Sequence, residues 1–349
     1  MVSQISNPTI NKSSPPLVSA IMAVRNEERY IERALTSLLQ QKTSGWDIEV
    51  IVVDGNSIDT TGEIVRRIAR EDPRVKLASN MHGKTPYAFN IGIEKSRGEY
   101  VCILGAHNRY AENYIATCLE ELELHSAAGC SGKVITRPGG DSLQAHLVAW
   151  TLAHPFGSSS GSMRTRSAGF ADSIPYPLFR KSTLLNIGVY NTVLHRNQDN
   201  DLNQRLRARG HKLYITDKTF CEYFVISDLR SLARYAFKSG YWNIISFKVN
   251  PESMSLRHFI PGAFVLVLIL NLIMVGYSIV THTHPWMATP FILLVTVYVL
   301  VSIVASCHTA CRVLSLGPLL MPIPLFLLHV FYGAGNLAAI VGNARSPSD

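Results

Sequence analysis

The feature of this sequence that most constrains its fold is a series of three long apolar stretches in the last third of the chain. The first runs from residue 259 to 280 and the second from 286 to 305, and neither contains a charged side chain. A helix of about 20 apolar residues is long enough to cross a bilayer. The alternative is a set of buried helices in a soluble domain, but a chain of 349 residues has little room to bury three such stretches. We therefore predict membrane-spanning helices.

The third apolar stretch, residues 314–341, is interrupted by Pro318, Pro322, Pro324 and a Gly-Ala-Gly sequence. Membrane helices tolerate such residues where their neighbours satisfy the freed backbone groups. We therefore predict a kinked span or a re-entrant segment here. The three stretches together predict a membrane domain of about three hydrophobic spans at residues 258–343.

The distribution of charge predicts how the chain is oriented. The formal net charge is +8, and almost all Lys and Arg precede residue 258. The segment before the first span is basic, the loop "THTHP" after it has no Lys or Arg, and the next loop carries Arg312. Basic loops stay on the cytoplasmic side, so we expect a multi-pass protein of the cell (inner or plasma) membrane with a cytoplasmic N-terminal domain. No nucleic-acid partner is expected, because the charges do not form a recognisable nucleic-acid motif.

Three further features concern the parts outside the spans. Residues 226–257 contain "SLARYAFKSGYWNIISFKV", which mixes basic and aromatic residues at helical spacing and predicts an interfacial amphipathic segment, with an ordinary domain helix as the alternative. Residues 1–15 form a polar tail without the apolar core of a signal peptide. The six cysteines include no CxxC pair, so we expect reduced thiols and not a disulfide framework.

The N-terminal part alternates apolar runs of strand length with amphipathic helical segments. Strands are predicted at residues 17–24, 48–54, 75–79 and 100–105, and helices at 28–41, 59–72 and 85–96, with Asp59 as a helix N-cap. This alternation predicts an α/β fold, a parallel sheet with helices on both faces. Ligands of such sheets bind beyond the carboxyl ends of the strands. The predicted binding rim therefore comprises residues 24–27, 54–59 and 105–109.

The residues that follow the predicted strands exclude two common kinds of nucleotide-binding site. No GxGxxG follows the first strand and no Walker A motif occurs, so neither a dinucleotide enzyme nor a P-loop ATPase is expected. Asp54 ends the second strand, where a carboxylate can accept hydrogen bonds from a base or a ribose. The alternative role for Asp54 is that of a turn former.

Four segments carry a family resemblance: "AVRNEERYIERALTSLLQQ", "IEVIVVDGNSIDTTGEIV", "GKTPYAFNIGIEKSRGEYVCILGAH" and "QDNDLNQRLRARGHKLYITD". The chain resembles the inverting nucleotide-sugar glycosyltransferases of family 2, which have the GT-A fold, and within them the membrane-bound succinoglycan-type glucosyltransferases of exopolysaccharide synthesis. The resemblance implies a Rossmann-like, mostly parallel sheet with helices on both faces, followed by C-terminal transmembrane helices. The glycosyltransferase domain would cover residues 16–225.

The resemblance also implies roles for individual residues. The nucleotide-sugar would be held by a set of eight residues: Ala23, Arg25, Glu27, Asp54, Asn56, Lys84, Gly105 and Ala106. Lys84 falls where a basic group meets the diphosphate. Many relatives have a second arginine at the position of Phe89, so Arg164 is the further candidate for that contact. The donor or acceptor loop would include Arg164, Asp172 and Gln198.

The chemistry of transfer requires one base and help for the leaving group. An acceptor hydroxyl must lose a proton on the face opposite the departing diphosphate, and one carboxylate suffices for that. Asp199 falls on the base of the family, with Asp201 as a rival and an N-cap role as the alternative. The position of His107 in the family motif implies that it faces a divalent cation, Mn²⁺ or Mg²⁺, and a neutral imidazole is a good Mn²⁺ ligand. The alternative is a structural histidine with satisfied hydrogen bonds. Gly105 stands where the family motif has its first aspartate, and we expect Asn108 to replace part of that contact.

The sequence thus predicts a membrane-anchored inverting glycosyltransferase. Its donor would be a UDP-sugar and its acceptor a lipid-linked or polysaccharide chain, with membrane lipid and an exopolysaccharide synthesis complex as further partners. Two alternatives stay open. The first is a catalytically degenerate, nucleotide-sugar-binding subunit of a polysaccharide synthase. The second is a transferase that acts on a polyprenyl phosphate.

Overall fold

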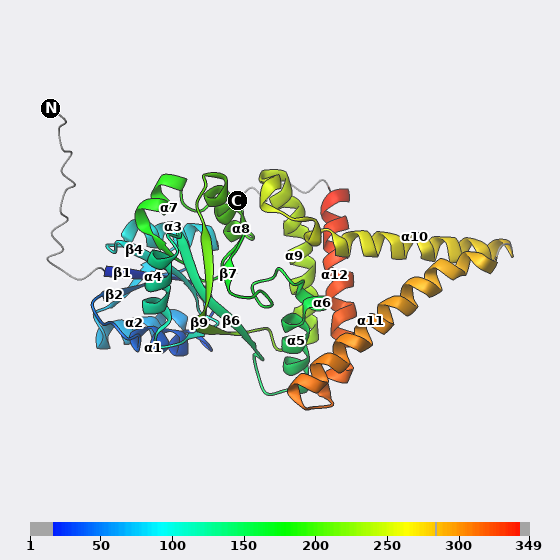
Figure 1. Ribbon diagram of the computed structural model, residues 1–349, viewed down its shortest axis with the longest axis horizontal. Coiled ribbons are helices and arrows are strands. Elements are labelled where there is room, and N and C mark those ends of the chain that lie inside the picture. Colours follow the sequence, from blue (N-terminus) through cyan, green and yellow to red (C-terminus); the bar gives the residue numbers. More distant parts are fainter. Residues whose placement is uncertain (1–16, 283–284, 343–349) are drawn as a thin grey trace.

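The structure is a computed structural model that describes residues 17–282 and 285–342. The predicted polar tail at residues 1–15 lies outside the described residues. Figure 1 shows a sheet flanked by helices at one end and a pair of long helices, α10 (Ile260–Thr281) and α11 (Thr289–Val313), at the other. Two more long helices, α9 (Leu229–Val249) and α12 (Pro322–Val341), stand between them.

The sheet has the order β3-β2-β1-β4-β8-β6-β9-β5, and β7 pairs with β9. The strands β3, β2, β1 and β4 are parallel, whereas β8 is antiparallel to both of its neighbours. The strands are β1 (Leu17–Val24), β2 (Asp47–Asp54), β3 (Val75–Ser79), β4 (Tyr100–Gly105), β5 (Asn108–Tyr110), β6 (Gly129–Arg137), β7 (Gly169–Phe170), β8 (Leu178–Arg180) and β9 (Leu213–Phe224). The predicted α/β fold class is confirmed, with a parallel half and a mixed half.

Helices cover both faces of the sheet because the strand side chains are apolar on both faces. On one face, Val18, Ala20 and Met22 pack with α1 (Ile31–Leu39), α2 (Thr61–Glu71) and α4 (Tyr114–Leu124). On the other face, Ile21 and Val53 belong to clusters that include α3 (Thr85–Lys95), α7 (Lys181–Ile187) and α8 (Gln198–Ala208). The strand ends of β1, β2 and β4 therefore meet at one rim.

Most predicted element limits agree with the structure, with a shift at one helix start. The strands β1, β3 and β4 occupy the predicted residues. Thr60, not Asp59, is the N-cap residue of α2. Asp59 still acts on this helix end, because its carboxylate accepts the backbone N–H of Thr61 at 3.0 Å. All six cysteines are free, as predicted.

The remaining helical segments connect the sheet to the long helices. They are α5 (Leu143–Ala153), α6 (Pro155–Ser158), and the 3-10 turns η1 (Pro251–Ser253), η2 (Leu256–His258), η3 (Pro285–Ala288) and η4 (Gly317–Leu320). Three helices, α10, α11 and α12, are long and apolar enough to cross a membrane. Pro318 lies in η4, and Pro322 and Pro324 lie in the first turn of α12, where the missing N–H has no helical partner to lose. The helix α12 is therefore continuous from Pro322 to Val341, and the prolines lie before it or at its start instead of within it.

The helices α9 and α12 touch through their backbones. A Cβ atom at Gly240 would lie 1.9 Å from the carbonyl oxygen of Tyr332, and one at Gly335 would lie 2.1 Å from that of Phe237. Only glycine permits this approach, which is typical of packed membrane helices. Asn336 adds a side-chain hydrogen bond to the carbonyl oxygen of Gly240 at 2.9 Å.

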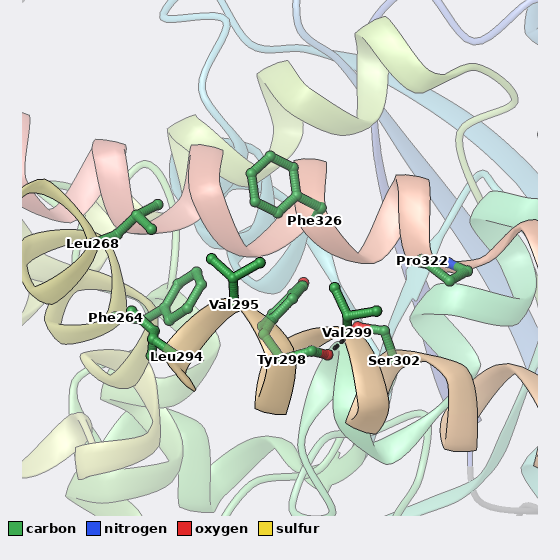
Figure 2. Close-up of a pocket in the computed structure, with 9 residues that line it drawn as sticks. All are labelled: Phe264, Leu268, Leu294, Val295, Tyr298, Val299, Ser302, Pro322 and Phe326. Carbon is green, nitrogen blue, oxygen red and sulfur yellow. Dashed lines mark hydrogen bonds between the residues drawn. The ribbon is translucent and has the colours of Figure 1, made fainter. Parts of the chain in front are cut away.

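A small apolar cavity of about 160 Å³ lies among α10, α11 and α12. Figure 2 shows its lining: Phe264, Leu268, Leu294, Val295, Tyr298, Val299, Ser302, Pro322 and Phe326. The hydroxyl of Ser302 donates to the carbonyl oxygen of Tyr298 in its own helix at 2.8 Å. The cavity contains no acidic or basic side chain, so transfer chemistry has to be sought elsewhere.

Candidate active site

The loops after β1 and β2 are locked together at the rim of the sheet. The backbone N–H of Asn26 donates to Ser57 Oγ at 2.9 Å, and the N–H of Ile58 donates to Asn26 Oδ1 at 2.9 Å. Asn26 and Asn56 both have positive φ angles, 57° and 61°, which asparagine tolerates better than most residues. These contacts give the two strand tips one fixed geometry.

Asp54 takes part in this lock through only one of its oxygens. Its Oδ1 accepts the backbone N–H of Ser57 at 3.1 Å and the hydroxyl of Ser57 at 2.6 Å. Gly55 follows, and its N–H donates to the carbonyl oxygen of Val24 at 2.9 Å. Asp54 therefore both forms the turn and presents a carboxylate at the rim, so the two roles considered for it are compatible.

A cleft of about 410 Å³ opens beside these loops. Its lining comes from the ends of β1, β2 and β4: Asn26, Glu27, Glu28, Arg29, Tyr30, Ile58, Asp59 and His107. Glu27 and His107 are the two predicted site residues that the cleft brings together. The cleft is polar and lies at the strand tips, where ligands of such sheets bind.

Glu27 and His107 are in direct contact. Glu27 Oε1 lies 3.0 Å from His107 Nε2, and Glu27 Oε2 is buried without a hydrogen-bond partner. The imidazole of His107 is 40% exposed and packs against the ring of Tyr30, with centroids 4.4 Å apart. Within residues 17–282 and 285–342, no group of three or more His, Cys, Asp or Glu is arranged to hold a metal ion. The protein offers two adjacent ligands, and a cation here would need others from its substrate.

Crowding around Gly105 explains the absence of a carboxylate at the first motif position. Gly105 pairs with Ala23 across the sheet, and Ala106 is buried directly after it. A Cβ atom at Gly105 would lie 3.0 Å from Asn108 Oδ1 and 3.1 Å from the ring of Tyr176. A side chain would therefore fit only if these neighbours moved.

Asn108 does not line the cleft. It is fully buried, and its Nδ2 donates to Cys221 Sγ at 3.5 Å. Among the described residues its Oδ1 has no hydrogen-bond partner, and it lies 3.0 Å from the place of a Cβ atom at Gly105. The expectation that Asn108 replaces part of the missing contact stays a prediction.

The basic residues near the rim are spread over two loops. Arg25 donates to the carbonyl oxygen of Gly83 at 3.3 Å, which connects the tip of β1 to the loop before α3. Lys84 is the N-cap residue of α3, next to that contact. Phe89 packs against Tyr190 with ring centroids 5.0 Å apart. The position at which the family resemblance implies an arginine is thus used for packing. Arg25 and Lys84 lie at these two loops, and Arg29 lines the cleft itself.

Asp199 lies in the first turn of α8 and is oriented by the contacts of that turn. Asn197, with a φ of 60°, donates from Nδ2 to Asn243 Oδ1 at 2.9 Å and to Ser246 Oγ at 3.0 Å, both in α9. The side chain of Asp199 is exposed at the surface. The protein that surrounds its carboxyl group partly desolvates it, and this raises the pKa of Asp199. Gln198 is its neighbour, and Gln198 Oε1 is buried without a partner. Asp199 has the environment of a carboxylate suited to accept a proton.

Asp201 has a structural role instead. It is buried, and its carboxylate accepts hydrogen bonds from Arg205 at 2.9 Å and from Asn250 at 2.8 Å. A carboxylate held in this way cannot reach an acceptor hydroxyl. Of the two rivals, only Asp199 is accessible.

The two remaining candidates, Arg164 and Asp172, differ in their distance from the cleft. Arg164 lies with its guanidinium carbon 5.2 Å from the ring centre of Tyr223, and that ring lies 6.5 Å from His107. Arg164 therefore approaches the cleft through one aromatic side chain, and it lowers the pKa of Tyr235 in α9. Asp172 is an exposed loop residue, 3.6 Å from Arg166, and does not line the cleft.

Four residues at the site lie outside the predicted rim. Glu28, Arg29 and Tyr30 line the cleft, and Tyr223 stands between Arg164 and His107. Glu28 and Tyr30 were detectable, since they belong to the "RNEERY" segment that follows the first strand. Tyr223 comes from β9, more than 100 residues away, and gave no local signal.

Comparisons with known proteins identify the family. Residues 19–182 match the family described as Glycosyl transferase family 2. The chain is 21% identical over 339 residues to the dolichyl N-acetyl-alpha-D-glucosaminyl phosphate 3-beta-D-2,3-diacetamido-2,3-dideoxy-beta-D-glucuronosyltransferase of Methanococcus voltae, which covers 94% of this chain and 98% of that protein. It is 28% identical over 242 residues to the succinoglycan biosynthesis protein ExoA of Rhizobium meliloti, which covers 68% of this chain and 72% of that protein.

A solved structure supports the fold. The mannosyltransferase PcManGT of Pyrobaculum calidifontis, solved with GDP-Man and Mn²⁺, superimposes with a TM-score of 0.58 at 16% identity, over 95% of this chain and 89% of that one. At this identity the likeness concerns the fold alone, which is the predicted GT-A type. Residues 19–182 thus match glycosyl transferase family 2, and this match and the named relatives support an enzyme of the glycosyltransferase type.

Proposed function

We propose that this protein is a membrane-anchored, inverting glycosyltransferase that moves a sugar from a UDP-sugar to a lipid-linked or polysaccharide acceptor, with Asp199 as the general base. The observation that carries the proposal is the position of Asp199. It is the accessible carboxylate of α8, its pKa is raised by desolvation, and it lies on the side of the molecule where the sheet meets α9. An inverting transfer needs one such base and no enzymatic nucleophile.

The donor would bind at the rim of the sheet. Asp54 and the turn at Asn56 would hold the nucleoside, and Arg25 and Lys84 would meet the diphosphate, whose charge grows as the bond to the sugar breaks. Glu27 and His107 fit a divalent cation, Mn²⁺ or Mg²⁺, because Glu27 Oε2 is buried without a partner beside an imidazole nitrogen. Such cations commonly take their other ligands from substrate phosphates. When bound, the cation would neutralise charge on the leaving group.

The acceptor class is supported by the relatives and by the helices. One relative is named for transfer onto a dolichyl-phosphate-linked sugar, and the other for succinoglycan biosynthesis. Three helices of this chain are long and apolar enough to cross a membrane. We place the catalytic domain at residues 16–225, the interfacial segment at 226–257 and the membrane domain at 258–343. The basic residues before α10 support a catalytic domain on the cytoplasmic side of the cell membrane.

The test is release of UDP from a panel of UDP- and GDP-sugars by the full chain in membranes, with Asp199→Asn against wild type. Removal of a general base lowers turnover by about 100-fold or more. The matched control is Asp217→Asn, the same change at an exposed carboxylate of β9. Full turnover in Asp199→Asn would exclude Asp199 as the base.

A second candidate is a nucleotide-sugar-binding subunit without turnover, favoured by the crowded Gly105. It predicts binding of UDP by calorimetry and no release of UDP from any donor on the panel. The remaining alternative, transfer to a polyprenyl phosphate, predicts a product that carries one sugar and partitions into organic solvent.

A further inference from the structure

Two arginines from distant parts of the sequence meet at a single glycine. Gly161 lies in the loop after α6, where a Cβ atom would be 1.8 Å from Nη1 of Arg257 and 3.7 Å from Nη2 of Arg166. Both guanidinium groups therefore approach the same point of the loop. The loop is tied back on itself, because the hydroxyl of Thr165 donates to the carbonyl oxygen of Ser159 at 2.5 Å.

The positive charge of this pair is poorly balanced. Within the described part of the chain, Arg257 forms no ion pair, and Arg166 has only Asp172, at 3.6 Å. Asp172 is 73% exposed and is shared with Arg207 at 4.0 Å. Desolvation and the nearby Arg166 lower the pKa of Arg257, and the attraction of Asp172 opposes this only in part. Two partly buried cations side by side favour an anion between them.

The pair stands where the chain enters its apolar helices. Arg257 belongs to η2, which leads directly into α10. Leu256 directly precedes Arg257 and Ile260 follows three residues later, and these side chains are 86% and 63% exposed. If α10 spans the membrane, Arg257 is at the depth of lipid headgroups, with apolar surface next to it.

The pair also borders the helix of the proposed base. The segment after Asp172 runs along α8, since Ser173 Oγ is 3.2 Å from Asn200 Oδ1 and accepts a hydrogen bond from Asn203 Nδ2 at 2.9 Å. Asn200 directly follows Asp199. An anion held by Arg166 and Arg257 would thus lie between the membrane and the first turn of α8.

We propose that Arg166 and Arg257 bind the phosphate group of the lipid-linked acceptor. Guanidinium groups bind phosphate through paired hydrogen bonds, and a lipid phosphate is the anion found at headgroup depth beside apolar surface. The lipid chain would extend over the apolar surface at Leu256 and Ile260, and the sugar to be extended would point toward α8. This assignment rests on the proposed function and names the acceptor class of that site as a lipid phosphate or diphosphate.

Binding of farnesyl diphosphate to the purified full chain in detergent tests the proposal. Wild type should bind it, and Arg166→Gln and Arg257→Gln should each weaken binding by about tenfold, as expected when a hydrogen-bonded charge partner is lost. The control Arg70→Gln, an exposed arginine of α2, should leave binding unchanged. Absence of binding to wild type, or equal binding by wild type and both variants, would refute the proposal.

Two further measurements separate this proposal from its alternatives. Gly161→Ala retains both charges but places a methyl group where Arg257 lies, so it should also weaken farnesyl diphosphate binding while the melting temperature stays near that of the control. The affinity for UDP should not change in any variant. If UDP binding falls together with farnesyl diphosphate binding, the pair belongs to the donor diphosphate and the acceptor assignment is wrong. If farnesyl diphosphate binds as proposed but no sugar donor turns over, the phosphate site stands and the proposed transferase function fails.

Discussion

The sheet half and the long-helix half of this molecule distribute their large apolar side chains differently. In β2, the core residues Val50, Val52 and Val53 are fully buried. In α10, α11 and α12, large apolar side chains point outward, and several polar residues are buried: Asn271, Ser302, Ser306, Thr309 and Asn336. The first arrangement suits a protein surrounded by water. The second suits helices surrounded by hydrocarbon, where small and polar residues hold helices together.

The two halves also use different contacts for cohesion. The sheet half buries Glu49 and surrounds it with Ser19, Lys76 and the backbone N–H of Arg97, at 2.6 to 2.7 Å. The helical half brings backbones together at Gly240 and then adds single hydrogen bonds. The proposed base, Asp199, lies on a helix fixed by both halves, since α8 packs on the sheet and Asn197 bonds to α9. A substitution in the sheet half and a substitution in the helical half should therefore differ in their measured effects.

The largest effect is expected from Gly240→Leu. The new side chain would overlap the backbone of α12 at Tyr332, and neither backbone can move without separating the helices. We expect a loss of more than about 3 kcal/mol in stability, the upper range for overpacking. Thermal unfolding in detergent measures it. Gly276→Leu in α10 is the control, because a Cβ atom there has nothing within 4 Å, and equal stability of the two variants would show that α9 and α12 do not pack as described.

The next effect should be confined to the sheet half. Glu49→Gln neutralises the buried carboxylate. The two half-exposed cations beside it lose their counter-charge and the hydrogen bonds weaken, so we expect the free energy of unfolding to fall by about 2 kcal/mol. The partners of Glu49 hold its pKa at about 2 despite the desolvation that opposes this. Hydrogen exchange should quicken in β1 and β2 and stay unchanged in α10 and α11. Glu63→Gln, an exposed change in α2, is the control, and uniform quickening in both halves would contradict their independence.

The predictability of the two halves differs for a physical reason. The strands β1, β2 and β4 were readable because each is a buried apolar run that ends in polar residues, and such local patterns fix a parallel sheet. The strands β7 and β8 are two and three residues long, too short to show a period, so the antiparallel strand β8 that joins β4 to β6 was not foreseen. Short strands depend on tertiary contacts that a local pattern does not contain.

The candidate site also has a part that the sequence could predict and a part that it could not. The cleft at Glu27 and His107 follows from strand tips that are adjacent in a predicted sheet. The tie between Asn197 and α9, and the meeting of Arg166 with Arg257, join residues far apart in sequence through side chains with no shared pattern. The burial of Asn108 was equally hidden, because it depends on the position of Tyr176 and Cys221.

A smaller effect is expected from Asn336→Ala in the helical half. The variant loses one interhelical hydrogen bond to Gly240, and such bonds in membrane proteins contribute about 1 kcal/mol. The lowered stability should appear in thermal unfolding in detergent. Asn271→Ala is the control, because the amide of Asn271 bonds to Val267 within its own helix and connects no helices. A loss in Asn336→Ala no greater than in Asn271→Ala would remove this hydrogen bond from the contacts that hold α9 to α12.

The mildest perturbation is a fall in pH, which separates the buried carboxylate of Glu49 from the accessible carboxylate of Asp199 without any mutation. Since the folded pKa of Glu49 is about 2, its contribution to stability is complete above its unfolded value of 4.5 and is lost as the pH falls toward 2. The pKa of Asp199 is shifted the other way, above 3.8, so its basic form disappears at a higher pH than for an ordinary aspartate. On acidification, transfer should therefore fall while circular dichroism still reports a folded sheet, and it should return on neutralisation. The acid limb should be absent from the residual activity of Asp199→Asn and present in Asp217→Asn. A limb that persists in Asp199→Asn would assign the titration to another group.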